Sequence, residues 1–183
     1  LTTELVYGVL RRQGRLDWHI DQMSQVKPKK IDPAVRIALR LALYQILFLD
    51  RIPSHAAVNE AVKLVKSTQP AHVAGFVNAL LREAIRRGEN WNWPSPEKDP
   101  EGYLAVLTSH PKWFVRMFLQ EIGSNQTYKL CEANNSIAPM VLRVNALKTD
   151  SKTILAWLQQ NSIAAEPSPY LNDAIRISGL RQD

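Results

Sequence analysis

DPAVRIALRLALYQILFL, residues 32–49, is the most apolar helical stretch of the chain and decides its fold class. Asp32 followed by Pro33 is a typical helix start, with an N-cap residue and then proline at the first helical position. Apart from Arg36 and Arg40, which share one narrow stripe, the stretch is hydrophobic on almost all sides. We therefore predict a central, buried helix from Pro33 to Leu49, too short in its apolar part to cross a membrane.

Helical patterns also precede and follow this central helix. Leu16, Ile20 and Met23 form a short amphipathic stretch before it. After it, Pro53 begins a helix and another runs from Pro70 to Gly88, where glycine suits the residue after a helix end. The predicted inner faces of these last two helices are Ala57, Val58, Ala61, Val62 and Val65 on the first, and Val73, Phe76, Val77, Leu80, Leu81 and Ile85 on the second.

The period of the pattern changes in the second half of the chain. Residues 93–100 contain three prolines and are predicted to be a linker. Helices follow up to Asn134, and then a strand, a helix and two strands within residues 140–178. The predicted fold is mainly α: an all-α helical bundle over residues 1–92, followed over residues 101–183 by a short helical segment and an incomplete α+β (β-α-β-β) subdomain.

Positive charge is confined to the first half of the chain. Residues 1–92 contain 14 Lys and Arg against 8 Asp and Glu, while residues 93–183 contain 9 of each kind, so the first half carries the whole net charge of +6. A basic half joined to a neutral half indicates a polyanionic partner, most commonly nucleic acid. A soluble basic helical domain without such a partner is the alternative at this point.

Three basic clusters and Arg36 are the candidate contacts to that polyanion. The clusters lie at the end of the first helical stretch, in the loop before Pro33 and in the last turns before Gly88. Arginine binds phosphate through charge and paired hydrogen bonds, although helix C-termini also attract basic residues on their own account. The candidate nucleic-acid contacts are Arg11, Arg12, Arg15, Lys29, Lys30, Arg36, Arg82, Arg86 and Arg87.

Polar residues lie beside the predicted inner faces of two helices. Asn59 and Glu60 follow Val58, and Asn78 follows Val77. Buried amides and carboxylates need hydrogen-bond partners. We therefore predict a structural role for Asn59, Glu60 and Asn78, with hydrogen bonds to backbone or to one another across the helix pair.

The sequence contains no arrangement of residues typical of an active site. Its seven glycines form no phosphate-binding or dinucleotide-binding loop, and its four histidines lack metal-ligand spacing. Cys131, the single cysteine, is predicted to be a buried structural thiol, and Asp17 and Asp21 to solvate a helix surface. The sequence thus predicts no catalytic residue, no cofactor and no metal in this chain, and the lone cysteine and the lack of a leader indicate the cytoplasm.

Several segments in this order resemble a known family. They are LVYGVLR at residues 5–11, LYQIL at 43–47, RIPSHAAVNEA at 51–61, FVNALLR at 76–82, HPKW at 110–113 and PMVLRVN at 139–145. Together they resemble the NusB-like N-terminal region of the Sun/Fmu family of bacterial 16S rRNA (cytosine-5-)-methyltransferases. The resemblance covers nearly the whole chain.

This resemblance implies a partner and a cofactor as well as a fold. The chain would bind 16S ribosomal RNA and adjoin its own downstream methyltransferase domain. That domain would bind S-adenosylmethionine and use cysteines to methylate cytosine, whereas this chain would be inactive alone. The resemblance also implies that one helix precedes Leu1 and that the protein continues past Asp183.

Two other functions fit part of the same pattern. One is a transcription antitermination factor of the NusB type, which binds RNA with a small ribosomal protein and should end soon after Gly88. The other is a protein-interaction module whose helical face docks on the enzyme's own core and touches no RNA. Charge reversal at Lys29, Lys30, Arg86 and Arg87 separates this last function from RNA binding.

Overall fold

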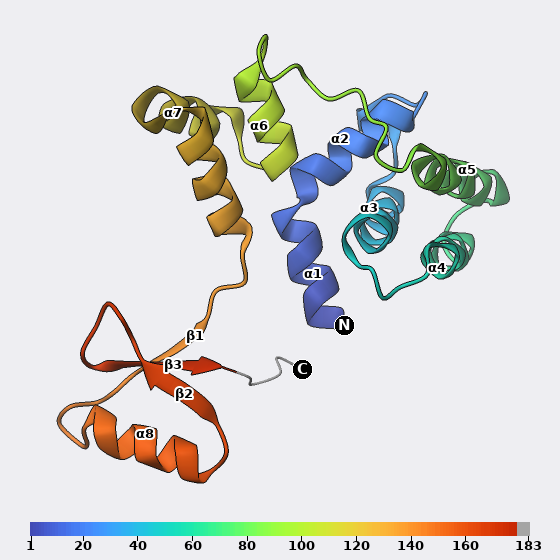
Figure 1. Ribbon diagram of the computed structural model, residues 1–183. Helices are drawn as coiled ribbons and strands as arrows, with labels where there is room; N and C mark the ends of the chain where they lie inside the picture. Colours follow the sequence, from blue (N-terminus) through green and yellow to red (C-terminus); the bar gives the residue numbers. More distant parts are fainter. Residues whose placement is uncertain (179–183) are drawn as a thin grey trace. The chain divides into compact units, whose positions relative to one another are not determined.

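The computed structural model describes residues 1–178 of the 183-residue chain. The chain forms two compact units, Leu1–Asn135 and Ser136–Asp183. The first unit consists of helices, whereas the second contains a helix and a small sheet (Figure 1). The predicted mainly-α fold class is therefore confirmed. The predicted course of the chain beyond Asp183 lies outside the described residues.

Among the first five α-helices, four surround a central one. The five are α1 (Thr2–Arg11), α2 (Gln13–Met23), α3 (Pro33–Phe48), α4 (Ser54–Lys66) and α5 (Ala71–Arg87), with a short 3-10 helix, η1 (Pro28–Lys30), before α3. The Asp32 carboxylate caps α3 by accepting a 2.8 Å hydrogen bond from the Ala34 amide. Since α3 packs on α1, α2, α4 and α5, its predicted central position is confirmed.

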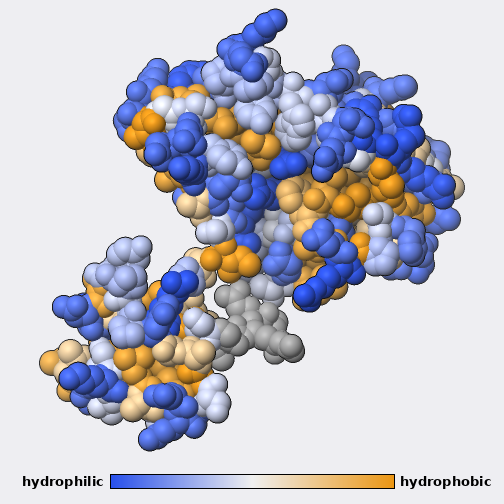
Figure 2. Space-filling view, in the orientation of Figure 1, coloured by the Kyte–Doolittle hydropathy of each residue, from blue (hydrophilic) through white to orange (hydrophobic). Residues whose placement is uncertain are grey.

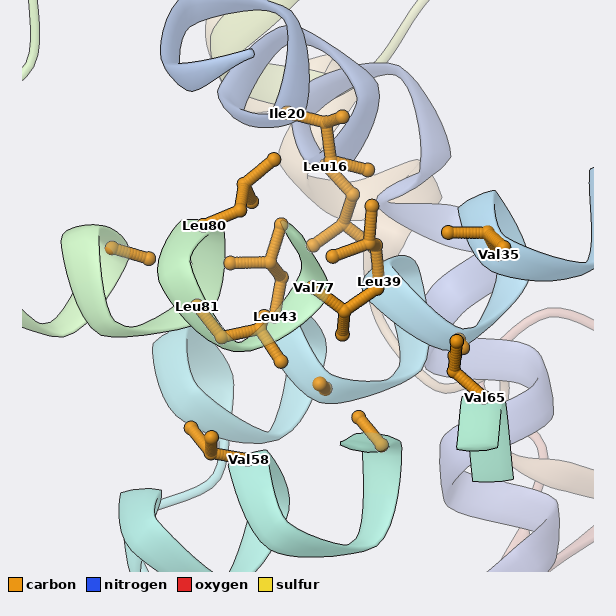
Figure 3. Close-up of a cluster of buried hydrophobic side chains, with 14 of the residues drawn as sticks. Leu16, Ile20, Val35, Leu39, Leu43, Val58, Val65, Val77, Leu80 and Leu81 are labelled. Atoms are coloured by element: carbon orange, nitrogen blue, oxygen red, sulfur yellow. The ribbon is translucent and has the colours of Figure 1, made fainter. Parts of the chain in front are cut away.

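The core of this bundle is aliphatic and is drawn from several helices. Figure 3 shows Leu16 and Ile20 of α2 lying close to Leu39 and Leu43 of α3 and to Leu80 of α5. Full burial of one such side chain contributes roughly 1.5–3 kcal/mol. Hydrophilic residues cover much of the visible face of the unit, around an apolar area over α3 and its neighbours (Figure 2).

The predicted inner faces of α4 and α5 are confirmed with one exception. Ala57, Val58, Ala61 and Val65 of α4 are buried, as are Val77, Leu80 and Leu81 of α5. Val62, Val73 and Phe76 are partly buried and pack against the same core. Ile85 is the exception, because its side chain is 42 % exposed. It lies in a hollow between α4 and α5 that is lined partly by polar residues.

Gly8 of α1 permits a close approach to α3. A Cβ atom at position 8 would overlap the Tyr44 ring. That ring stacks on Phe48 with 5.3 Å between centroids, and its hydroxyl donates a 2.6 Å hydrogen bond to Glu4. Burial, together with the Glu4 carboxylate, raises the pKa of Tyr44 to about 12. Only glycine lets α1 lie this close to the ring.

The first unit continues through the proline-rich segment that the sequence predicts to be a linker. Trp93 stacks on Trp18 of α2, with 4.6 Å between centroids, and Trp91 packs on His19 at 4.1 Å. Two further helices, α6 (Pro100–Thr108) and α7 (Lys112–Asn135, bent at Gly123), complete the unit, and α6 packs on α2. The compact units divide after Asn135, so the segment predicted to be a linker lies within the first unit, where the partly buried Trp93 attaches it to α2.

The second unit has the predicted β-α-β-β order. It contains β1 (Met140–Arg143), α8 (Ser151–Gln160), β2 (Ala164–Pro167) and β3 (Ala174–Ser178). The strands pair antiparallel in the order β1-β3-β2, with Met140 opposite Ile177 and Ala165 also opposite Ile177. Asp150 caps α8, and Leu158 of this helix packs against Ile175 and Ile177.

Candidate nucleic-acid interface

Two of the three arginines at the junction of α1 and α2 have partners inside the first unit. Arg12 donates from Nη1 and Nη2 to the Glu132 carboxylate at 3.0 and 3.2 Å. The Arg15 guanidinium lies 5.1 Å from the centroid of the Phe48 ring and 5.0 Å from that of Trp93. Burial lowers the pKa of Arg15, and the charge of Arg12 adds to this effect. Both arginines thus hold helices together, and their role as nucleic-acid contacts stays a prediction.

Arg36 also has internal partners. It donates from Nη1 to Asp17 at 3.1 Å and from Nη2 to the Pro28 carbonyl at 2.9 Å, and its side chain is only 14 % exposed. Asp17 accepts two further hydrogen bonds from Arg40, at 2.8 and 2.7 Å. Arg36 thus joins α3 to α2, and Asp17, predicted to solvate a surface, is instead the partner of both α3 arginines.

Five of the remaining basic candidates lie at the surface in three places. Lys29 and Lys30 are exposed on η1, and no ion pair holds either of them among residues 1–178. Arg82 and Arg86 are exposed on α5, whereas Arg11 of α1 is half-buried and lies over the ring of Tyr7. The charges of Lys29, Lys30, Arg82 and Arg86 face solvent, and that of Arg11 does so in part.

Glu83 holds two arginines at the end of α5. It accepts hydrogen bonds from Arg87 Nε at 2.8 Å and from Arg86 Nη2 at 2.6 Å, and these bonds, that from Arg87 first, lower the pKa of its carboxyl. Arg87 is mostly covered and lies over Trp91, 5.4 Å from the ring centroid. Arg86 is 77 % exposed and is the member of this group that presents its charge to solvent.

A polar hollow of about 390 Å³ lies between α4 and α5. Its polar residues are His55 and Asn59 on α4 and Asn78 and Arg82 on α5. Arg82 Nε donates a 3.2 Å hydrogen bond to Asn78 Oδ1, which orients the guanidinium and leaves its two terminal NH₂ groups for other acceptors. No carboxylate lines the hollow, so its polar groups and its one positive charge favour an anionic ligand.

The rest of the lining is apolar. Val58 and Val62 on α4 and Ile85 on α5 form it. Pockets of this size that combine an apolar surface with a few convergent polar groups are the usual form of a ligand site. We call this hollow, with its four polar and three apolar residues, the α4–α5 pocket.

The predicted structural role of the amides is corrected by the same geometry. Asn59 and Glu60 are exposed, and Glu60 forms its ion pair with Lys63 of its own helix at 2.7 Å. Asn78 bonds to Arg82, also within one helix. None of these bonds crosses the helix pair. Sequence periodicity placed Asn59 and Asn78 beside the apolar faces, where they border a pocket instead of the core, and it gave no sign that His55 joins them.

The other residues considered for chemistry are structural. Cys131 is fully buried beside Leu104 and Val115, and burial raises the pKa of its thiol, which confirms a structural thiol. Among residues 1–178 no group of three or more His, Cys, Asp or Glu side chains is arranged to hold a metal ion. Within the same residues, no helix has the length and hydrophobicity needed to span a membrane.

Two protein families match the chain. Residues 1–86 match the NusB family, and residues 110–181 match the ferredoxin-like domain of RsmF/B-like methyltransferases. The second match includes part of the first compact unit as well as the second unit.

Curated bacterial proteins are similar to the chain along nearly its whole length. It is 36 % identical over 179 residues to the probable ribosomal RNA small subunit methyltransferase B of Bacillus subtilis, covering 97 % of this chain and 39 % of that protein. It is 37 % identical over 175 residues to the ribosomal RNA small subunit methyltransferase B of Pseudomonas putida, covering 96 % and 38 %. The chain therefore spans less than half the length of these relatives.

One solved structure has a similar fold. The crystal structure of PH0851 superposes with a TM-score of 0.68 at 23 % sequence identity, covering 97 % of this chain and 39 % of that one. At this identity the likeness extends to the fold alone.

Proposed function

We propose that this chain, which belongs to the NusB family over residues 1–86 and matches an RsmF/B-like ferredoxin-like domain over residues 110–181, is the RNA-binding module of a ribosomal RNA methyltransferase. This domain order agrees with the resemblance to the N-terminal region of the Sun/Fmu family. Its task would be to hold ribosomal RNA in position for a catalytic core elsewhere in the same protein. The proposal places this work in the bacterial cytoplasm.

The α4–α5 pocket is the observation that supports RNA binding best. It combines the oriented guanidinium of Arg82 with two amides, and the exposed Arg86 lies one helical turn further along α5. Guanidinium groups bind phosphate with paired, charge-assisted hydrogen bonds. Lys29 and Lys30 on η1 add exposed charge that an RNA backbone would neutralise.

The finer chemistry is proposed from the family and from the names of the relatives. The substrate would be 16S ribosomal RNA, and the reaction would be methyl transfer from S-adenosylmethionine to C5 of a cytosine. We assign no catalytic or cofactor-binding residue to this chain, so the downstream domain would supply both. That domain would also be a partner of this module within the same protein.

The salt dependence of RNA binding tests the proposal. A fluorescently labelled 16S rRNA fragment would be titrated with the chain at 50 mM and 200 mM salt. We expect binding at low salt that weakens steeply with salt, because Lys and Arg contacts release counterions from phosphates. No detectable binding at 50 mM salt, or an affinity that does not respond to salt, would refute an RNA-binding role.

A transcription antitermination factor of the NusB type is the second candidate, and the NusB match favours it. Such a factor should end soon after Gly88, whereas this chain continues through α6, α7 and the β-α-β-β unit. The match of residues 110–181 to RsmF/B-like methyltransferases favours the targeting role over this second one.

A further inference from the structure

We propose that the α4–α5 pocket binds one unpaired nucleotide of the RNA, whose base is turned out of its stack into the space between the two helices. This inference rests on the proposed RNA-binding function and adds the kind of RNA that is bound and the residues that distinguish it. Nothing in the family matches assigns a ligand to this pocket.

The hydrogen-bonding groups of the pocket suit a base better than a bare phosphate. A phosphate only accepts hydrogen bonds, whereas a base edge both donates and accepts, as an asparagine amide does. The Asn59 amide makes no hydrogen bond to any residue in the described part of the chain, so its donors and its acceptor are both open. Asn78 keeps its NH₂ group for a ligand, because its oxygen already accepts from Arg82.

The remaining lining suits the flat face of a base and the phosphate attached to it. Val58, Val62 and Ile85 provide an apolar surface, and the Ile85 side chain is 42 % exposed. Bases that leave their stack are held by such surfaces and by guanidinium planes. Arg82, fixed through its Nε, would either stack on the base or bind the adjoining phosphate with its terminal NH₂ groups.

The apolar lining of the pocket favours a base that has left its stack. The pocket lies between two helices, and its polar groups come from both of them. A base inside an A-form duplex is stacked and presents no free face, so it has to be turned out before the apolar lining can contact that face. The pocket therefore predicts a preference for bulged or single-stranded RNA over continuous duplex.

Three RNAs that differ at one position test this preference. The first is a blunt 16-base-pair RNA duplex, the second is the same duplex with one bulged adenosine at its centre, and the third carries an abasic bulge in that place. The chain should bind the bulged duplex about tenfold more tightly than the other two, since only the bulged base offers both a free edge to the amides and a flat face to the aliphatic lining. Fluorescence anisotropy at one fixed salt concentration measures all three affinities.

Variants of the two amides connect the preference to the pocket. Asn59→Ala/Asn78→Ala should lose the tenfold preference, whereas Asn125→Ala/Gln126→Ala, which changes two exposed amides of α7, should retain it. Circular dichroism and the melting temperature should match wild type, because both pocket amides are surface groups with no partner across the helix pair. An unchanged fold ensures that any loss of preference reports on the pocket.

The possible outcomes separate the two proposals. If the wild-type chain binds the bulged and continuous duplexes equally, with the expected salt dependence, the pocket proposal is wrong and the RNA-binding function stands. The pocket proposal is equally overturned if the Asn59→Ala/Asn78→Ala variant retains the preference. Absence of binding to all three RNAs at 50 mM salt overturns the RNA-binding function and the pocket proposal together.

Discussion

Arg12 and Glu132 lie 120 residues apart in the sequence and form an ion pair through two hydrogen bonds, of 3.0 and 3.2 Å. The pair joins the junction of α1 and α2 to the last turns of α7. The hydrogen bonds from Arg12 hold the pKa of the Glu132 carboxyl below its usual range. The helices after the NusB match are thus joined to those within it by an arginine that the sequence also predicts to contact RNA.

Replacing Glu132 by glutamine should destabilise the first unit by about 1–3 kcal/mol, because charge-assisted paired hydrogen bonds between partly buried groups are stronger than neutral ones. Urea denaturation followed by circular dichroism measures the change. Glu101→Gln is the matched control, since its partner Arg116 is 63 % exposed and such pairs contribute about 0–1 kcal/mol. Equal effects of the two substitutions would show that the Arg12–Glu132 pair has no special role in stability.

His19 should make the stability of the first unit depend on pH. Burial and the nearby Arg15 charge lower its pKa to about 3, and its Nε2 accepts a 3.5 Å hydrogen bond from Arg15 Nε. The unfolded chain binds a proton at this residue below about pH 6.5, whereas the folded chain does so only near pH 3. Stability should therefore fall as the pH falls below 6.5, by up to about 1.4 kcal/mol for each pH unit.

The variant His19→Phe separates this effect from that of the carboxylates. Between pH 6.5 and 5 its free energy of unfolding should decline less steeply than that of wild type. The two slopes should differ by about one bound proton, the one that the unfolded wild-type chain takes up at His19. His72→Gln, which changes an exposed histidine at the start of α5, should follow the wild-type curve. Parallel curves for wild type and His19→Phe would mean that His19 titrates normally in the folded chain.

The same substitution at two helical glycines should have opposite effects. Gly8→Ala should lower stability by about 1–2 kcal/mol, because the new methyl group would displace the Tyr44 ring from its contacts with Phe48 and Glu4. Gly75→Ala should raise stability by about 0.5–1 kcal/mol, since open space surrounds that position and alanine favours a helix. Thermal or urea unfolding of the two variants checks the signs, and stabilisation by both would contradict the close approach of α1 to α3.

Charge reversal at Lys29 and Lys30 should weaken RNA binding and reduce its salt dependence. Each lost phosphate contact lowers the slope of log affinity against log salt by about 0.7–0.9. The control Lys112→Glu/Lys129→Glu makes the same change of net charge at exposed positions of α7. If both double variants lose RNA affinity to the same extent, the overall charge of the chain determines the affinity and a local contact by η1 does not.

The Asp32 cap, the proline after it and the long apolar period together predicted α3 and its central position, because a helix that is hydrophobic on almost all sides has to be surrounded. The change of period after Pro139 predicted the β-α-β-β order in the same way. The prolines of residues 93–100 predicted a break in secondary structure correctly. They did not show that Trp91 and Trp93 pack on α2, because this contact joins distant parts of the sequence.

The sequence by itself determined the helices, their caps and their apolar faces, since these depend on residues within a few turns of one another. Only the tertiary structure decided which charges are free. Arg12, Arg15 and Arg36 have ionic partners or aromatic neighbours that lie 19 to 120 residues away in the sequence. Lys29 and Lys30, in contrast, have no ion pair among residues 1–178. The α4–α5 pocket was decided in the same way, because its polar groups come from two helices and converge only once these helices have packed on α3.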